Sequence, residues 1–192
     1  MFSRINIFGI IGDHFYTLRR YDSSSRSISI EDFCLFILLP FIVSIMLTTL
    51  SVRLDSHVTD LITSISILGG FLFNLLAIIY GLIDKIKDSN IDTTANTEEA
   101  IRERIRQRFI KEIHVNISFN IVISLFILLL LVIYSYTLPV QSTDILIFYS
   151  TKFKIELLIN RAISLAIYFF LGVFSLTMLM IINRVYIILN RE

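Results

Sequence analysis

Four long apolar blocks, free of charged side chains and of histidine, constrain this chain more than any other feature of its sequence. They contain 18, 23, 22 and 21 residues and occupy positions 33–50, 61–83, 115–136 and 162–182. An α-helix rises about 1.5 Å per residue and the hydrocarbon core of a bilayer is about 30 Å thick, so about 20 apolar residues span it. We therefore predict an all-α integral membrane protein with four transmembrane helices.

The composition and the short stretches between the blocks argue against an enzyme. The chain is 55% hydrophobic and 17% charged, whereas a soluble domain is about 45–50% apolar and about 25% charged. Segments of about 30 residues rarely fold alone, and the blocks hold no ionisable group for intramembrane chemistry or ion coupling. Three separate segments carry His14, His57 and His114, and Cys34 is the only cysteine. We expect no catalytic residue, no metal and no cofactor.

Lysine and arginine are distributed unevenly over the two sides that four spans create. Cytoplasmic flanks of membrane proteins collect these basic residues. The N-terminal segment, the 84–114 connection and the C-terminal tail together hold 13 of the 17 lysines and arginines, and the other two connections hold 4. We therefore expect a multi-pass membrane protein with both termini and the 84–114 connection in the cytosol.

The blocks divide the chain into four parts. Residues 1–32 form a cytosolic segment whose apolar side chains follow one helical face, which predicts an amphipathic helix at the membrane interface. Residues 33–83 form the first transmembrane hairpin, and residues 84–114 form a cytosolic loop and a charged helix. Residues 115–192 form the second transmembrane hairpin, with an outer loop at 137–161 and a short cytosolic tail.

Proline and glycine refine the expected helices. Neither residue occurs between position 97 and Pro139, which predicts one helix of about 40 residues over 97–136. Its charged first part is expected to extend into the cytosol, and its apolar part forms the third span. Pro40 lies inside the first block, where it removes a backbone hydrogen bond and predicts a kink.

Polar and small residues recur every four positions in the second and third blocks, which places each set on one helix face. Small residues let membrane helices approach closely, and amides form hydrogen bonds between helices. Because the two helices are antiparallel, we expect Asn74 and Asn120 to meet. Two interpretations stay open, helix–helix packing and the lining of a pore. The residues concerned are Ser66, Gly70, Asn74, Asn116, Asn120 and Ser124.

Basic residues crowd the first part of the long helix. They suit docking of a cytosolic partner protein, a plain solvated helix face, or attraction to anionic membrane lipids. Acidic residues interleave with them and no aromatic platform accompanies them, so direct nucleic-acid binding is not expected. The candidate docking residues are Arg102, Arg104, Arg106, Arg108 and Lys111.

Two segments resemble a known membrane family. Residues 70–77 (GFLFNLLA) and residues 111–119 (KEIHVNISF), followed by Ser124, resemble the KwaA family, the small four-span subunits of the bacterial Kiwa anti-phage system. The resemblance implies a homo-oligomeric sensor and scaffold of the cell inner membrane, as a homotetramer. It also implies a response to phage attachment or injection at the envelope, and a cytosolic partner, KwaB, that acts on phage DNA.

Other functions remain compatible with the same sequence. An oligomeric pore-forming effector that depolarises the membrane would use the polar faces of the second and third spans as its conduit. An accessory subunit of a larger membrane complex would show no stable self-assembly. The sensor and scaffold is the interpretation that we carry forward, with the pore as its alternative.

Overall fold

The computed structural model describes residues 6–18, 34–50, 54–87, 98–137 and 150–190, and within these ranges it is helical and has no strand. The all-α fold class is thereby confirmed. The elements in chain order are α1 (Ile7–Thr17), the π-helical turn η2 (Cys34–Leu38), α3 (Leu39–Thr49), the 3-10 turn η3 (Asp55–His57), α4 (Val58–Lys87), α5 (Glu98–Thr137) and α6 (Ser150–Asn190).

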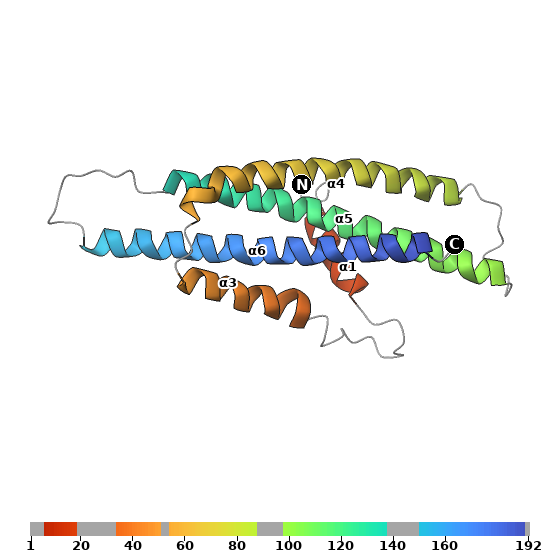
Figure 1. Cartoon of the computed structure of the whole chain (residues 1–192), viewed down its shortest axis with the longest axis horizontal. Coiled ribbons are helices and arrows are strands. Elements are labelled where there is room, and N and C mark those ends of the chain that lie inside the picture. Colours follow the sequence, from red (N-terminus) through yellow and green to blue (C-terminus); the bar gives the residue numbers. More distant parts are fainter. Residues whose placement is uncertain (1–5, 19–33, 51–53, 88–97, 138–149, 191–192) are drawn as a thin grey trace.

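The long helices lie side by side in a row (Figure 1). The order across the row is α4, α5, α6 and α3, and α1 packs against α5. The middle helix, α5, therefore has neighbours on several sides, whereas α4 packs mainly against α5 alone. Half of the apolar window of α5 is buried, against 22% for α4 and 28% for α6.

Three helices are long and apolar enough to cross a membrane: Val58–Asp84, Ala100–Tyr136 and Leu158–Ile187. Large apolar side chains on their outer faces are exposed, among them Ile67 at 67% and Leu179 at 62%. Such faces need lipid or another protein as a neighbour, so the chain is a membrane protein. The first predicted span corresponds to the shorter apolar helix Cys34–Thr49, and the count of four spans stays a prediction.

The predicted disturbance at Pro40 takes the form of a wide turn. Residues Cys34–Leu38 are π-helical, and α3 begins at Leu39, which places Pro40 in the first turn of that α-helix. A proline is tolerated there because its missing N–H would have no partner within the helix. Pro40 also lies against Gly172 of α6, where an added Cβ would come within 2.9 Å of the proline Cβ. α3 and α6 therefore make close backbone contact.

The two longest helices test the expected connections. The prediction of a single long helix is confirmed by α5, which has 40 residues. The outer loop expected at 137–161 is wrong in its second half, because α6 begins at Ser150. No glycine or proline interrupts the chain between Pro139 and Gly172, so nothing in the sequence stops this helix from starting early. The rest of that loop, 138–149, lies outside the described residues.

The N-terminal segment contains a short capped helix. The side-chain oxygen of Asn6 accepts a hydrogen bond of 2.9 Å from the backbone N–H of Gly9, at the start of α1. This contact satisfies one of the backbone donors that a helix start leaves open. A location of α1 at the membrane interface stays a prediction, and residues 1–5 and 19–33 of the segment lie outside the described part.

Candidate functional site

A row of polar side chains on α5 lies inside the protein. Asn116 and Asn120 are fully buried and Ser124 is 2% exposed. The four-residue spacing had placed them on one helix face, and that face packs against the other helices. Buried polar groups need hydrogen-bond partners, so the partners of this row show which elements it holds together.

The middle and far end of the row contact α6 and α4. The side-chain amide of Asn120 donates a hydrogen bond of 3.3 Å to the backbone carbonyl of Phe174 in α6. The Ser124 hydroxyl donates to the carbonyl of Ile121 in its own helix. It also lies beside Gly69 of α4, where an added Cβ would be 3.3 Å from the Ser124 oxygen. The two helices therefore approach closely at Gly69.

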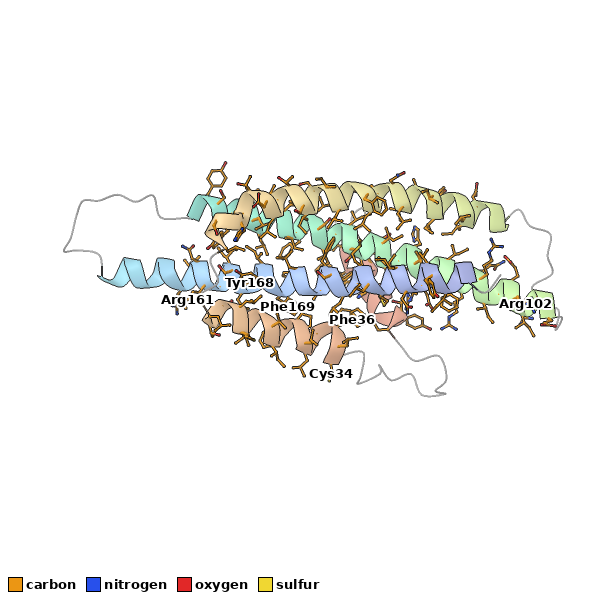
Figure 2. All side chains as sticks on the ribbon, in the orientation of Figure 1. Cys34, Phe36, Arg102, Arg161, Tyr168 and Phe169 are labelled. Carbon is orange, nitrogen blue, oxygen red and sulfur yellow. The ribbon has the colours of Figure 1, made fainter. Side chains whose placement is uncertain are left out.

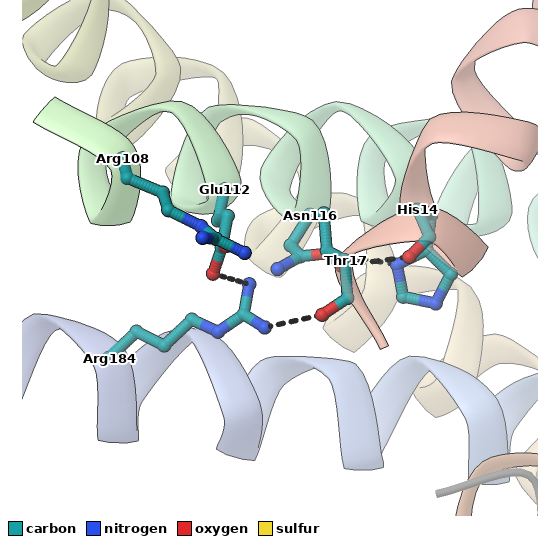
Figure 3. Close-up of polar contacts among 6 residues, drawn as sticks. All are labelled: His14, Thr17, Arg108, Glu112, Asn116 and Arg184. Carbon is teal, nitrogen blue, oxygen red and sulfur yellow. Dashed lines mark hydrogen bonds and ion pairs between the residues drawn. The ribbon is translucent and has the colours of Figure 1, made fainter. Parts of the chain in front are cut away.

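The near end of the row binds α1 through a histidine (Figure 3). His14 is 1% exposed, and its Nδ1 lies 2.9 Å from the side-chain oxygen of Asn116. An amide oxygen can only accept, so Nδ1 carries the proton of this hydrogen bond. The His14 ring stacks on Phe119 with centroids 3.7 Å apart and planes 2° from parallel. Asn116 and Phe119 lie one turn apart on α5, so a single turn holds the ring by a hydrogen bond and by stacking.

Thr17 and Arg184 connect the Asn116 end of the polar row to α6. The Thr17 hydroxyl lies 3.0 Å from the side-chain oxygen of Asn116, and the guanidinium of Arg184 donates to the Thr17 carbonyl over 3.1 Å. A second nitrogen of Arg184 is 3.4 Å from the carboxylate of Glu112. That carboxylate also accepts a 3.0 Å hydrogen bond from Arg108. We call these six residues the polar cluster: His14, Thr17, Arg108, Glu112, Asn116 and Arg184.

The polar cluster combines charged groups with a neutral histidine. Two guanidinium groups share the single carboxylate of Glu112. Burial lowers the pKa of His14 to about 4, the hydrogen bond with Asn116 opposes this shift, and the positive charge of Arg184 adds to it. The imidazole is consequently neutral at pH 7.

The small-residue row of α4 faces away from the other described helices. Ser66, Gly70 and Asn74 are exposed, and a Cβ added at Gly70 would meet nothing within 4 Å. The expected meeting of Asn74 with Asn120 is therefore wrong. The face of α4 that packs on α5 carries branched apolar side chains, including Ile65, Leu72 and Ile79.

The candidate docking residues lie on the exposed end of α5, where Figure 2 shows Arg102. Arg102 pairs with Glu98 over 2.7 Å, and Arg106 lies 3.9 Å from Glu103. Arg108 belongs to the polar cluster and is half exposed, so it reaches both the buried contacts and the surface. The remaining exposed members of this set are Arg104 and Lys111.

Sequence reasoning missed three members of the polar cluster. His14 was noted only as an isolated histidine, Thr17 was not considered, and Arg184 was counted only as a basic residue of the tail. The available signal was Arg184 itself, since it is a single charge two residues after the uncharged block 162–182. A charge this close to an apolar span either extends to the membrane interface or pairs with a polar group of the protein. The identity of the partner depended on how α1 folds back, which periodicity does not reveal.

The described residues contain no group of three or more His, Cys, Asp or Glu side chains able to hold a metal ion. No protein-family model, no curated protein and no solved structure matches the chain significantly. The geometry of the polar cluster and of the exposed end of α5 is therefore the basis for a functional proposal.

Proposed function

We propose that this protein is a non-enzymatic sensor and scaffold subunit of a bacterial anti-phage complex. It resides in the inner membrane as a homo-oligomer, a tetramer, with both termini in the cytosol. It detects phage attachment or injection at the envelope and holds a cytosolic, KwaB-like partner that acts on DNA. The observation that carries the proposal is the continuity of α5, because this one helix carries both an exposed basic surface and the most buried of the three apolar windows.

The continuity of α5 supports signalling from the membrane to a docked partner. Its first 15 residues, 98–112, extend over about 22 Å at the usual rise per residue. They carry exposed arginines, and the same helix continues into the buried row at Asn116 and Asn120. A shift of the neighbouring helices at that row moves the exposed end without any intervening loop. A packed interface with two discrete arrangements is the type of element that transmits such a shift.

The docking part of the proposal is tested by charge reversal. Replacement of Arg102, Arg104 and Arg106 by glutamate should release the partner in co-purification from membranes, because a rim of like charges opposes association. The control is Arg161→Glu, an exposed arginine at the other end of the molecule (Figure 2), which should leave the partner bound. Equal retention of the partner by the triple variant and by the control would remove this end of α5 as the docking surface.

The pore-forming alternative is favoured by one observation, the exposure of a polar row on α4. Asn74 is exposed within a helix that can span a membrane, so a conduit formed between several copies could be lined by Ser66, Gly70 and Asn74. Asn120 is fully buried and would not line it. Flux of ions through liposomes should then be lost in Asn74→Leu and kept in a folded Asn120→Leu protein, whereas impermeable liposomes would exclude the pore.

A further inference from the structure

The buried amide of Asn116 uses only one of its two ends within the polar cluster. Its side-chain oxygen accepts hydrogen bonds from His14 and Thr17. Its side-chain nitrogen, Nδ2, is fully enclosed and has no hydrogen-bond partner among the residues that the structure describes. A buried donor without a partner is destabilising, and folded proteins satisfy nearly all such groups through protein atoms or ordered water. The Asn116 nitrogen therefore indicates a bound group that accepts a hydrogen bond.

An acceptor with spare capacity lies one helical turn away. Figure 3 shows the Asn116 nitrogen on the side of its amide that points toward Glu112. The two residues are four positions apart on α5, so their Cβ atoms are about 5–6 Å apart on one helix face. The Glu112 carboxylate accepts a hydrogen bond from Arg108 and lies 3.4 Å from Arg184. A carboxylate offers about four acceptor positions, so Glu112 can accept a further hydrogen bond.

The chemistry of these two ends selects the bound group. It must accept a hydrogen bond from an amide N–H and donate one to a carboxylate. An anion would be repelled by Glu112, and a cation would meet the amide hydrogens of Asn116. A water molecule is neutral and both accepts and donates. Buried water molecules typically satisfy polar groups that the protein itself leaves unpaired, with about three hydrogen bonds each.

We propose that one water molecule binds between Asn116 and Glu112, accepting from the Asn116 nitrogen and donating to the carboxylate. The hydrogen bonds then run in one direction, from His14 to Asn116, to the water and to Glu112. Hydrogen bonds in such a chain polarise and strengthen one another. Arg108 donates to the same carboxylate and is half exposed, so the water joins the α1 contact to the surface end of α5. The inference concerns the polar cluster alone and is independent of any role in phage defence and of any docked protein.

The water is detectable in the unmodified protein in lipid bilayers by solid-state NMR. Magnetisation from water protons should reach the side-chain NH₂ group of Asn116, although this residue is fully buried. A structure that resolves ordered water should place a water oxygen within about 2.7–3.2 Å of both the Asn116 nitrogen and a Glu112 oxygen. The absence of transfer, or a direct hydrogen bond between Asn116 and Glu112, would overturn the proposal.

Two variants that lose the same charge show whether Glu112 is the acceptor. Glu112→Gln and Glu112→Leu both remove the carboxylate, but only glutamine keeps a side-chain oxygen that can accept from water. Transfer to Asn116 should persist in Glu112→Gln and be lost in Glu112→Leu. Equal transfer in the two folded variants, the result expected if protons arrive through the Thr17 hydroxyl instead, would contradict the proposal. If Glu112→Leu does not fold, the resolved water position decides, and a water beyond hydrogen-bond distance of Glu112 rules the bridge out.

Discussion

Two rows of polar and small residues with the same spacing have opposite positions in this protein. On α5, Asn116, Asn120 and Ser124 are buried. On α4, Ser66, Gly70 and Asn74 are exposed. Both rows recur every four residues, and both lie on helices that can cross a membrane. The period of a pattern therefore identifies a helix face but does not reveal what that face contacts.

The number of neighbours explains the difference. α5 packs against α4, α6 and α1, whereas α4 packs mainly against α5. A helix with several neighbours must bury more of its circumference, including its polar face, and each buried amide then needs a partner. A helix at the end of the row buries one face against its single neighbour and leaves the other face, with large apolar side chains such as Phe71 and Phe73, to lipid or to a second protein.

The largest effect is expected from two adjacent glycines of α4. Gly69→Leu should destabilise the protein by about 3 kcal/mol, because the new side chain meets Ser124 in a filled interface. Gly70→Leu should change the free energy of unfolding by less than about 0.5 kcal/mol, since a Cβ at Gly70 meets nothing within 4 Å. Thermal unfolding in detergent distinguishes the two. Equal destabilisation would mean that both glycines face protein.

A smaller effect is expected from removal of an amide in each row. Asn116→Leu should cost about 2 kcal/mol, because it leaves the buried His14 ring without its hydrogen-bond acceptor and removes one contact of the partly buried Thr17. Asn74→Leu should be close to neutral, because Asn74 is exposed. The midpoint of thermal unfolding measures both changes. A neutral Asn116→Leu variant would show that the contact with α1 contributes little to stability.

The smallest expected effect is a pH dependence of the free energy of unfolding, caused by the burial of His14 between α1 and α5. The folded protein keeps His14 neutral, with its pKa lowered from 6.5 to about 4 by burial. The unfolded chain therefore binds more protons between these values, so stability is complete above pH 6.5 and falls as the pH drops toward 4. From about pH 7.5 to about 5.5 the loss attributable to His14 is about 1 kcal/mol.

The matched variant for this pH dependence is His14→Phe. It retains an aromatic ring that can stack on Phe119 and removes the titrating group. The difference in unfolding free energy between the unmodified protein and His14→Phe should shrink as the pH falls. A difference that stays constant with pH would show that His14 takes up its proton without leaving Asn116.

The sequence predicted the parts of the fold that depend on local chemistry. Uncharged blocks identified the long apolar helices, the absence of glycine and proline identified the 40-residue α5, and the spacing of Asn116 and Asn120 identified a helix face. The early start of α6 was missed because apolar and polar residues alternate near Ser150 without a helix boundary signal. The position of α1 and the identity of the α4 face that packs on α5 were missed, because both depend on contacts between residues far apart in the chain. His14 contacts Asn116 in the first case, and Gly69 lies beside Ser124 in the second.

The most direct measurement of the central claim is disulfide formation between α4 and α5. A Cβ at Gly69 would lie 3.9 Å from the Ser124 Cβ, which is close to the usual Cβ separation of about 3.8 Å in disulfides. In a protein with Cys34→Ser, the pair Gly69→Cys and Ser124→Cys should form an intramolecular disulfide on mild oxidation in membranes. The pair Asn74→Cys and Asn120→Cys should form none. A disulfide at 74–120 and none at 69–124 would contradict the arrangement of the two rows.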